Sequence, residues 1–322
     1  MADELELLRR ANPVPADGPH FGDGPLDHNA EWHLNRLLHD RTPRHRFRKL
    51  AWGLTATAVV AATVSALLLS GPGTTPAIAA PRPLVVQAGS TPVPLDRLAE
   101  RAEAAAADGS HRLRMGTHEQ SWSLGTSDDK PPITLPEERV VRRQADGSHT
   151  ELVVATDPSH PGRPVLTDEG GDPRTVADGH VLSDRTYPPS WSDAPPESPP
   201  PHDAARLRAH LAETAHSSSQ TTPELLDAVE ELLGHWTLGA RETAALARLL
   251  ADTGQPRPVG QVTDRLGRRD QAYVHDASGS RRMLIMDPVT GAVLGLELTS
   301  TVDEPEYGLR AGDVMEYSAW MR

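Results

Sequence analysis

The chain has 322 residues and a formal net charge of −13 at pH 7, and its length is enough for about two domains with a sizeable core. It contains no cysteine, which excludes disulfide bonds, thiolate metal sites and a cysteine nucleophile. Aromatic residues make up 4% of the chain, and its 30 prolines and 25 glycines indicate a loop-rich protein with a lean hydrophobic core.

The first segment, residues 1–49, is too short to bury a core of its own. Two stretches in it have helical spacing of apolar residues, Asp3–Ala11 and Glu31–Asp40. Their apolar positions are Leu5, Leu8, Leu34, Leu37 and Leu38. Short amphipathic helices gain little by folding alone and more by docking, so we expect these leucines to bind a cytoplasmic partner. The alternative is an unstructured leader that only sets topology.

Residues Leu50–Leu69 form an uncharged stretch of 20 residues, long enough as a helix to cross about 30 Å of hydrocarbon. Basic residues crowd its N-terminal flank, whereas residues 71–80 carry no charge. The positive-inside rule therefore predicts a single-pass protein of the cell membrane with a cytoplasmic N-terminus and an extracellular C-terminus. A signal peptide cleaved near Ala80 is the alternative, although 49 preceding residues are far more than a usual n-region.

The negative charge lies entirely beyond the predicted transmembrane helix. Residues 1–49 contain 8 Lys+Arg and 8 Asp+Glu, so the whole −13 belongs to the remainder. An acidic outer domain repels nucleic acid and anionic polymers, so we expect no nucleic-acid partner.

A Pro/Gly/Thr-rich tether, residues 70–83, is expected to lead into an outer domain over residues 84–322. A helix is predicted over Leu95–Ala107, which is rich in Ala, Glu and Arg. Strands are expected over Arg112–Leu124, Glu138–Gln144 and His149–Ala155, with a hairpin turn at Asp146-Gly147. A proline-rich break at 188–201 follows, and it either separates two domains or is a surface loop of one.

After the break the sequence predicts three helices and then a meander of strands. The helices are Asp203–His216, Leu225–Leu233 with Thr222 as N-cap, and Ala240–Ala251. The strands are Val259–Asp264, Gln271–Asp276, Arg282–Met286, Ala292–Ser300 and Val314–Met321. Short turns at 277–280 and 287–291 make consecutive strands antiparallel. The outer domain is therefore expected to be α+β, a curved antiparallel sheet with helices on one face.

Motifs that carry chemistry have little support. The 15 histidines show no metal-ligand spacing, so we expect them on the solvated surface and expect no metal or other cofactor. The string Asp-Gly-Ser-His at 108–111 and 146–149 is explained by turn chemistry. Ser127-Asp128-Asp129-Lys130 has the spacing of a serine–lysine pair, but the prolines that follow disfavour a helix there. No catalytic residue is assigned, and we expect no enzyme activity.

The basic cluster Arg265–Arg269 has two interpretations. It can attract an anionic ligand, or it can form a solvated turn paired with neighbouring carboxylates. In an acidic domain the second interpretation is the one we expect.

Several short strings give the chain a resemblance to a known family. They are Asp3-Glu4-Leu5, Leu8 through Pro15, the basic-flanked apolar stretch, Val262 through Arg268, and Asp287 through Gly291. With these the chain resembles an actinobacterial family of single-pass membrane proteins of uncharacterised function, typically encoded beside extracytoplasmic-function sigma factors. The resemblance implies an anti-sigma-like regulator with a sigma factor as cytoplasmic partner. Zinc-containing anti-sigma domains use a histidine and two cysteines, and the absence of cysteine here excludes that metal site.

Two functions follow as hypotheses. The first is a membrane regulator that couples the outer domain to a cytoplasmic partner. The second is a membrane-tethered module that binds a lipid or lipoprotein without signalling, suggested by a loose similarity of the expected sheet to half-barrel envelope proteins.

Overall fold

The computed structural model describes residues 81–107, 111–127, 130–169, 173–189, 198–214 and 221–321. All of them belong to one compact unit, Val60–Arg322. The other unit, Met1–Val59, lies outside the described residues, as does the predicted transmembrane helix Leu50–Leu69.

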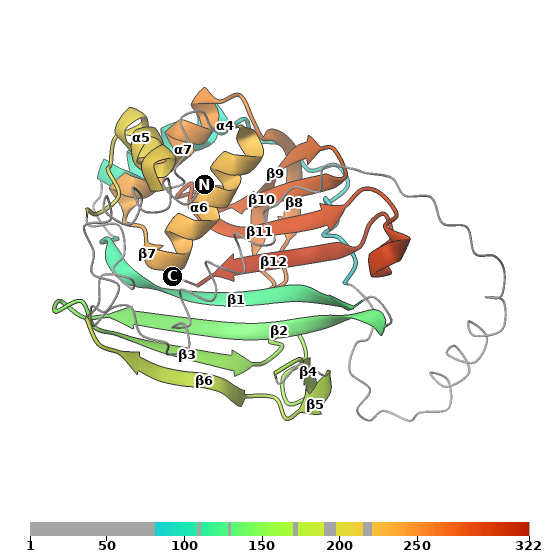
Figure 1. Ribbon diagram of the computed structural model, residues 1–322. Helices are drawn as coiled ribbons and strands as arrows, with labels where there is room; N and C mark the ends of the chain where they lie inside the picture. The colour runs from blue at the N-terminus through green and yellow to red at the C-terminus, as the bar shows by residue number, and fades with distance from the viewer. Residues whose placement is uncertain are drawn as a thin grey trace, which may run out of the picture. The chain divides into compact units, whose positions relative to one another are not determined.

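The described residues form an α+β domain with one large antiparallel sheet and four α-helices, which confirms the predicted fold class (Figure 1). The helices are α4 (Leu95–Ala107), α5 (Ala204–Thr214), α6 (Thr222–His235) and α7 (Ala240–Asp252), and a short 3-10 helix covers Pro305–Tyr307. No helix in the described ranges is long and apolar enough to cross a bilayer. The single-pass architecture therefore stays a prediction.

The large sheet is a continuous antiparallel array in the order β6-β3-β2-β1-β12-β11-β10-β9-β8, with β7 paired to one end of β1. Its strands are β1 (Arg114–Ser127), β2 (Lys130–Arg143), β3 (His149–Ala155), β6 (His180–Tyr187), β7 (Trp236–Thr237), β8 (Arg257–Thr263), β9 (Arg269–Ala277), β10 (Ser280–Met286), β11 (Val293–Ser300) and β12 (Val314–Trp320). A separate hairpin joins β4 (Val165–Thr167) to β5 (Arg174–Val176). Because β1 pairs directly with β12, the segments before and after the proline-rich break share one sheet.

Most predicted elements are confirmed, and the misses have local causes. The helix α4, the strand β3 and the meander β8–β12 were predicted, and α4 and β3 match to the residue. The strand β6 was missed because most of its side chains are exposed or half-buried, so its sequence has no apolar alternation. Ser127 and Lys130 pair within the β1–β2 hairpin, so they are not on one helix, as the prolines after Lys130 indicated.

The helix α6 begins at Thr222 rather than at the predicted Leu225, and its N-cap lies one residue earlier than predicted. Its N-cap is Thr221 rather than Thr222, and the Glu224 carboxylate accepts hydrogen bonds from the Thr221 backbone N–H (2.7 Å) and hydroxyl (2.8 Å). This is a capping box, and it satisfies donors that the first turn leaves free. The helix then continues through Gly234, which was predicted to follow its end, as far as His235.

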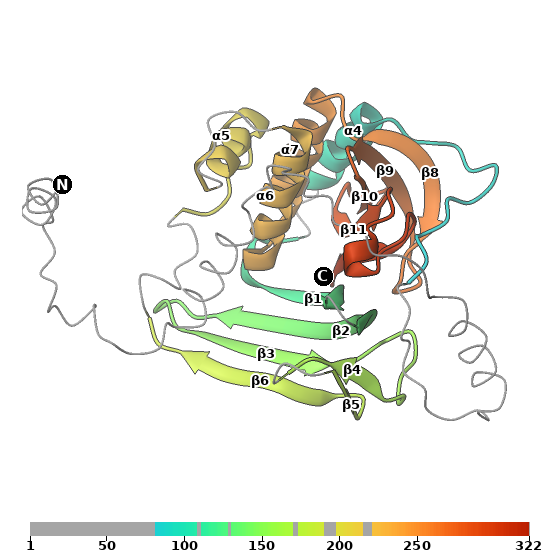
Figure 2. The same ribbon diagram turned by 45° about the vertical axis from the view of Figure 1, so that its right-hand side comes forward.

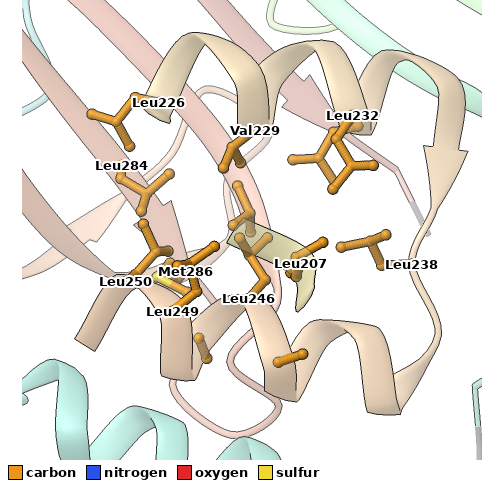
Figure 3. Close-up of a cluster of buried hydrophobic side chains, with 14 of the residues drawn as sticks. Leu207, Leu226, Val229, Leu232, Leu238, Leu246, Leu249, Leu250, Leu284 and Met286 are labelled. Atoms are coloured by element: carbon orange, nitrogen blue, oxygen red, sulfur yellow. The ribbon is translucent and has the colours of Figure 1, made fainter. Parts of the chain in front are cut away.

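The main core lies between the helices and one face of the sheet (Figure 3). Leucines of α5, α6 and α7 meet Leu284 and Met286 of β10 there. The same face also buries Tyr273 of β9 and Trp320 of β12. This is the apolar stripe of each amphipathic helix covering the apolar side of the strands.

A second, smaller core lies on the other face of β8–β12. The residues that alternate with those of the main core point into it, including Val274, Ile285 and Tyr317. Leu84 and Val86, which precede α4, pack against this second core. In Figure 2 the blue-green segment before α4 runs beside β8 on this side of the domain.

Candidate functional site

The five leucines predicted to bind a partner, Leu5, Leu8, Leu34, Leu37 and Leu38, lie outside the described residues. The geometry described below therefore belongs to the α+β domain. Charged side chains gather inside this domain at two places. One is a pocket between α6 and the sheet, and the other is the part of the sheet that contacts the segment before α4.

The pocket under α6, which we call the acidic pocket, is lined by Asp227, Glu230, Arg282, Leu296, Leu298 and Glu316. It has about 20 Å³ of water-accessible space, which is room for a single water molecule and for no organic ligand. Arg282 of β10 donates to the Asp227 carboxylate and, at 3.2 Å, to the Pro223 carbonyl of α6. The pocket is thus a polar joint between α6 and the sheet.

Carboxyl groups crowd one side of this joint. Ser318 of β12 donates its hydroxyl hydrogen to Glu230 at 3.2 Å, and it also hydrogen-bonds Glu119 of β1. Burial, followed by repulsion from Glu316 and Glu119, raises the pKa of Glu230 to about 8. Burial likewise raises the pKa of both Glu119 and Glu316. Part of this cluster therefore holds protons near neutral pH.

Sequence reasoning missed the acidic pocket, although it contained one signal. Glu230 follows Leu226 by four residues and precedes Leu233 by three, so it lies on the apolar stripe of α6. A carboxylate in that position is unusual, because buried acids need partners. What the local pattern could not supply was the pairing of β1 with β12, which puts Glu119 and Glu316 on the same face of the sheet, on either side of the Ser121–Ser318 pair.

The segment that precedes α4 is held by a buried ion pair on the opposite face of the sheet. Glu297 of β11 is 1% exposed, and its carboxylate lies 2.5 Å from the Arg265 guanidinium. The second oxygen of Glu297 accepts the backbone N–H of Leu84 at 2.9 Å. Arg265 donates to the Arg82 carbonyl at 3.0 Å and lies 5.1 Å from the centre of the Tyr317 ring.

The interpretation of Arg265–Arg269 as a solvated turn paired with carboxylates is confirmed for the pairing, and the turn is only partly solvated: Gly267 and Arg269 are exposed, whereas Arg265 and Arg268 are half-buried. Arg265 is 14% exposed, and Arg268 donates to the buried carboxylate of Asp264. Arg268 also donates to the carbonyls of Trp320 in β12 and Leu294 in β11, so it joins these two strands to the turn after β8. Arg265 lies against Tyr317 of the second core.

The expectation of surface histidines is wrong at two positions. His149 stacks on Tyr187 with ring centres 4.6 Å apart, and it is buried. His210 lies on α5 between the buried Leu207 and Leu211, where burial lowers its pKa. Across the described ranges, no three or more His, Asp and Glu side chains are placed to hold a metal ion.

The turn interpretation of Asp-Gly-Ser-His is confirmed at 146–149. Asp146 accepts hydrogen bonds from the Ser148 backbone N–H (2.9 Å) and hydroxyl (2.6 Å), which is an Asx turn. The earlier copy lies largely outside the described residues.

No family model matches the chain, and no curated protein matches it. Its function must therefore be argued from its own sequence and geometry.

Proposed function

We propose that the protein is a single-pass membrane regulator, anti-sigma-like, in which the α+β domain outside the cell controls a sigma factor bound by residues 1–49. The predicted transmembrane helix Leu50–Leu69 connects the two. In this proposal the described domain is a sensing and coupling module and catalyses no reaction.

The observation that carries the proposal is the direct seating of the chain on the sheet soon after the predicted helix. Pro81 and Arg82 belong to the predicted tether, yet both already contact the domain. The Pro81 carbonyl accepts from the Val314 N–H at 3.4 Å, and the Arg82 carbonyl accepts from Arg265. Between the predicted helix and Pro81 the chain has only residues 70–80, and a chain of this length spans at most about 40 Å. In this proposal, a movement of the sheet is therefore transmitted to the predicted transmembrane helix through a short segment of chain.

The test is co-purification of the sigma factor with the full chain extracted from native membranes. Alanine substitution of all five leader leucines should abolish co-purification, since the apolar faces that dock are removed. A matched control carries Glu6→Ala and Asn35→Ala, which change polar positions of the same two stretches. Equal recovery of the partner with both variants would overturn the proposal.

The second candidate, a tethered lipid- or lipoprotein-binding module, has one observation in its favour. The sheet face away from the helices carries a second apolar cluster that includes Trp122, Val274 and Met283; these side chains are buried, so a lipid would enter only where this face opens. Native mass spectrometry of the full chain would support this candidate if a lipid remained bound. An apo mass together with partner co-purification would favour the regulator.

A further inference from the structure

Residues 81–90, which we call the strap, cross the sheet face that the helices leave free. In the first half of the strap the backbone N–H of Leu84 donates to Glu297, and the carbonyl of Arg82 accepts from Arg265. The Glu297–Arg265 ion pair therefore holds the strap at two successive points. Glu297 is almost completely buried, so its carboxylate depends on these donors for compensation.

The second half of the strap lies along β8, the end strand of the sheet. Gln87 donates its backbone N–H to the Gln261 carbonyl at 2.8 Å and its side-chain amide to Thr263 at 3.2 Å. The Gln261 N–H donates in turn to the hydroxyl of Ser90 at 3.0 Å. The strap thus covers part of a free strand edge without forming a regular strand.

Side chains of the strap alternate between the second core and solvent. Leu84 and Val86 are partly buried against that core, whereas Val85 between them is 80% exposed. Two half-buried apolar side chains stabilise the seated strap far less than the full leucine rows stabilise the helices. Segments with few buried contacts open locally at lower free energy than the core.

We propose that the strap is a releasable latch, with the Glu297 carboxylate as its catch. Opening it adds about 30 Å of extended chain between the predicted transmembrane helix and the sheet. Opening also uncovers the part of the second core that Leu84 and Val86 cover. This role rests on the proposed function, because only a membrane regulator uses the length and seating of this link as a signal.

The latch has two states, and anything that prefers one of them shifts their populations. The seated state holds the sheet close to the membrane. The released state lengthens the link and exposes the edge of β8. The Glu297 carboxylate makes both bonds of the seated state: it accepts from the Leu84 backbone N–H of the strap and from Arg265, which itself donates to the strap.

Hydrogen exchange measured by mass spectrometry on the full chain in lipid nanodiscs tests this directly. In the native chain, the amides of Leu84 and Gln87 should exchange at least about ten-fold faster than the amides of β10 and β11. Glu297→Gln removes the ion pair and keeps the shape, so strap exchange should rise about ten-fold further while β10 and β11 stay unchanged. The matched control is Asp276→Asn, which breaks exposed ion pairs to Arg257 and Arg281 near β8 and should leave the strap unchanged.

A locked variant provides the opposite perturbation. Because the chain has no cysteine, Gln87→Cys with Thr263→Cys introduces the only thiols, at two side chains already in contact. Joining them with a short cross-linker should lower strap exchange to the rate of β10 and β11. This result does not depend on any cytoplasmic partner, so it stands or fails separately from the co-purification test.

Three results would overturn the latch. In the first, the strap amides of the native chain exchange at the same rate as those of β10 and β11. The strap would then open only when the whole sheet opens. The second is an equal effect of Glu297→Gln and Asp276→Asn. The third is a cross-linked chain whose strap exchanges as fast as before. If Glu297→Gln does not fold, the native and cross-linked chains still decide the question.

Discussion

Replacing Glu230 with glutamine should reduce the loss of stability that the native chain shows between about pH 6 and about pH 8. Burial and the neighbouring Glu316 and Glu119 raise the pKa of Glu230 from 4.5 to about 8. The folded domain therefore keeps a proton on Glu230 that the unfolded chain releases. Stability from this group is complete below about pH 4.5 and is lost as the pH rises through about 8.

The size of the effect follows from linkage. Each pH unit between the two pKa values removes at most about 1.4 kcal/mol from the free energy of unfolding. From pH 6 to pH 8 the upper bound is about 3 kcal/mol. Glu230 keeps partial contact with water, and screening lowers the expected loss to roughly 1.5 kcal/mol. Burial raises the pKa of Asp270 to about 6. Most of its effect on the free energy of unfolding therefore falls below pH 6, outside the measured range.

Urea unfolding of the full chain in detergent, followed by tryptophan fluorescence at the two pH values, measures this loss. Urea is preferred to guanidinium because a salt would screen the repulsion within the acidic pocket. Glu230→Gln carries no proton to lose at this position, so its unfolding free energy should fall by roughly 1.5 kcal/mol less over the window than that of the native chain. The control Glu100→Gln alters an exposed carboxylate of α4 and should keep the full pH dependence.

An unchanged pH dependence in Glu230→Gln would refute the reasoning, because the loss would then come from groups elsewhere. So would a native domain that grows more stable from pH 6 to pH 8, since in this window that sign requires a group that binds its proton more weakly in the folded state, such as His210, whose pKa burial lowers.

Three further substitutions test the packing and the backbone, each by urea unfolding at a single pH. Leu250→Ala, at a fully buried position of α7, should cost about 3 kcal/mol through lost burial and a cavity. Gly116→Ala should cost more than about 2 kcal/mol, because Gly116 has φ +111° and a Cβ there would lie 2.3 Å from the Val141 carbonyl oxygen. Thr221→Ala should cost about 1 kcal/mol, since it removes the hydroxyl that bonds Glu224 at the start of α6. Losses below about 0.3 kcal/mol would contradict each of these assignments.

Local signals in the sequence were sufficient for much of the fold. The helix α4 follows from an Ala/Glu/Arg-rich stretch with apolar residues at helical spacing, and the turn after β2 follows from Asp146-Gly147. The meander β8–β12 follows from apolar strands joined by short turns. Each of these depends on residues within a few positions of one another, so spacing and turn chemistry decide them.

The candidate sites were decided by contacts between distant parts of the chain. The pairing of β1 with β12 joins residues about 200 positions apart, and it puts Glu119 and Glu316 on the same face of the sheet. Likewise, Glu297 meets Leu84 across 213 positions. A pattern along the chain indicates which face a residue occupies, but long-range strand pairing determines what lies opposite it. The sequence alone therefore determined the element types and the apolar segment at 50–69. Only the tertiary structure decided where buried charges meet, because that depends on the register between strands far apart in the chain.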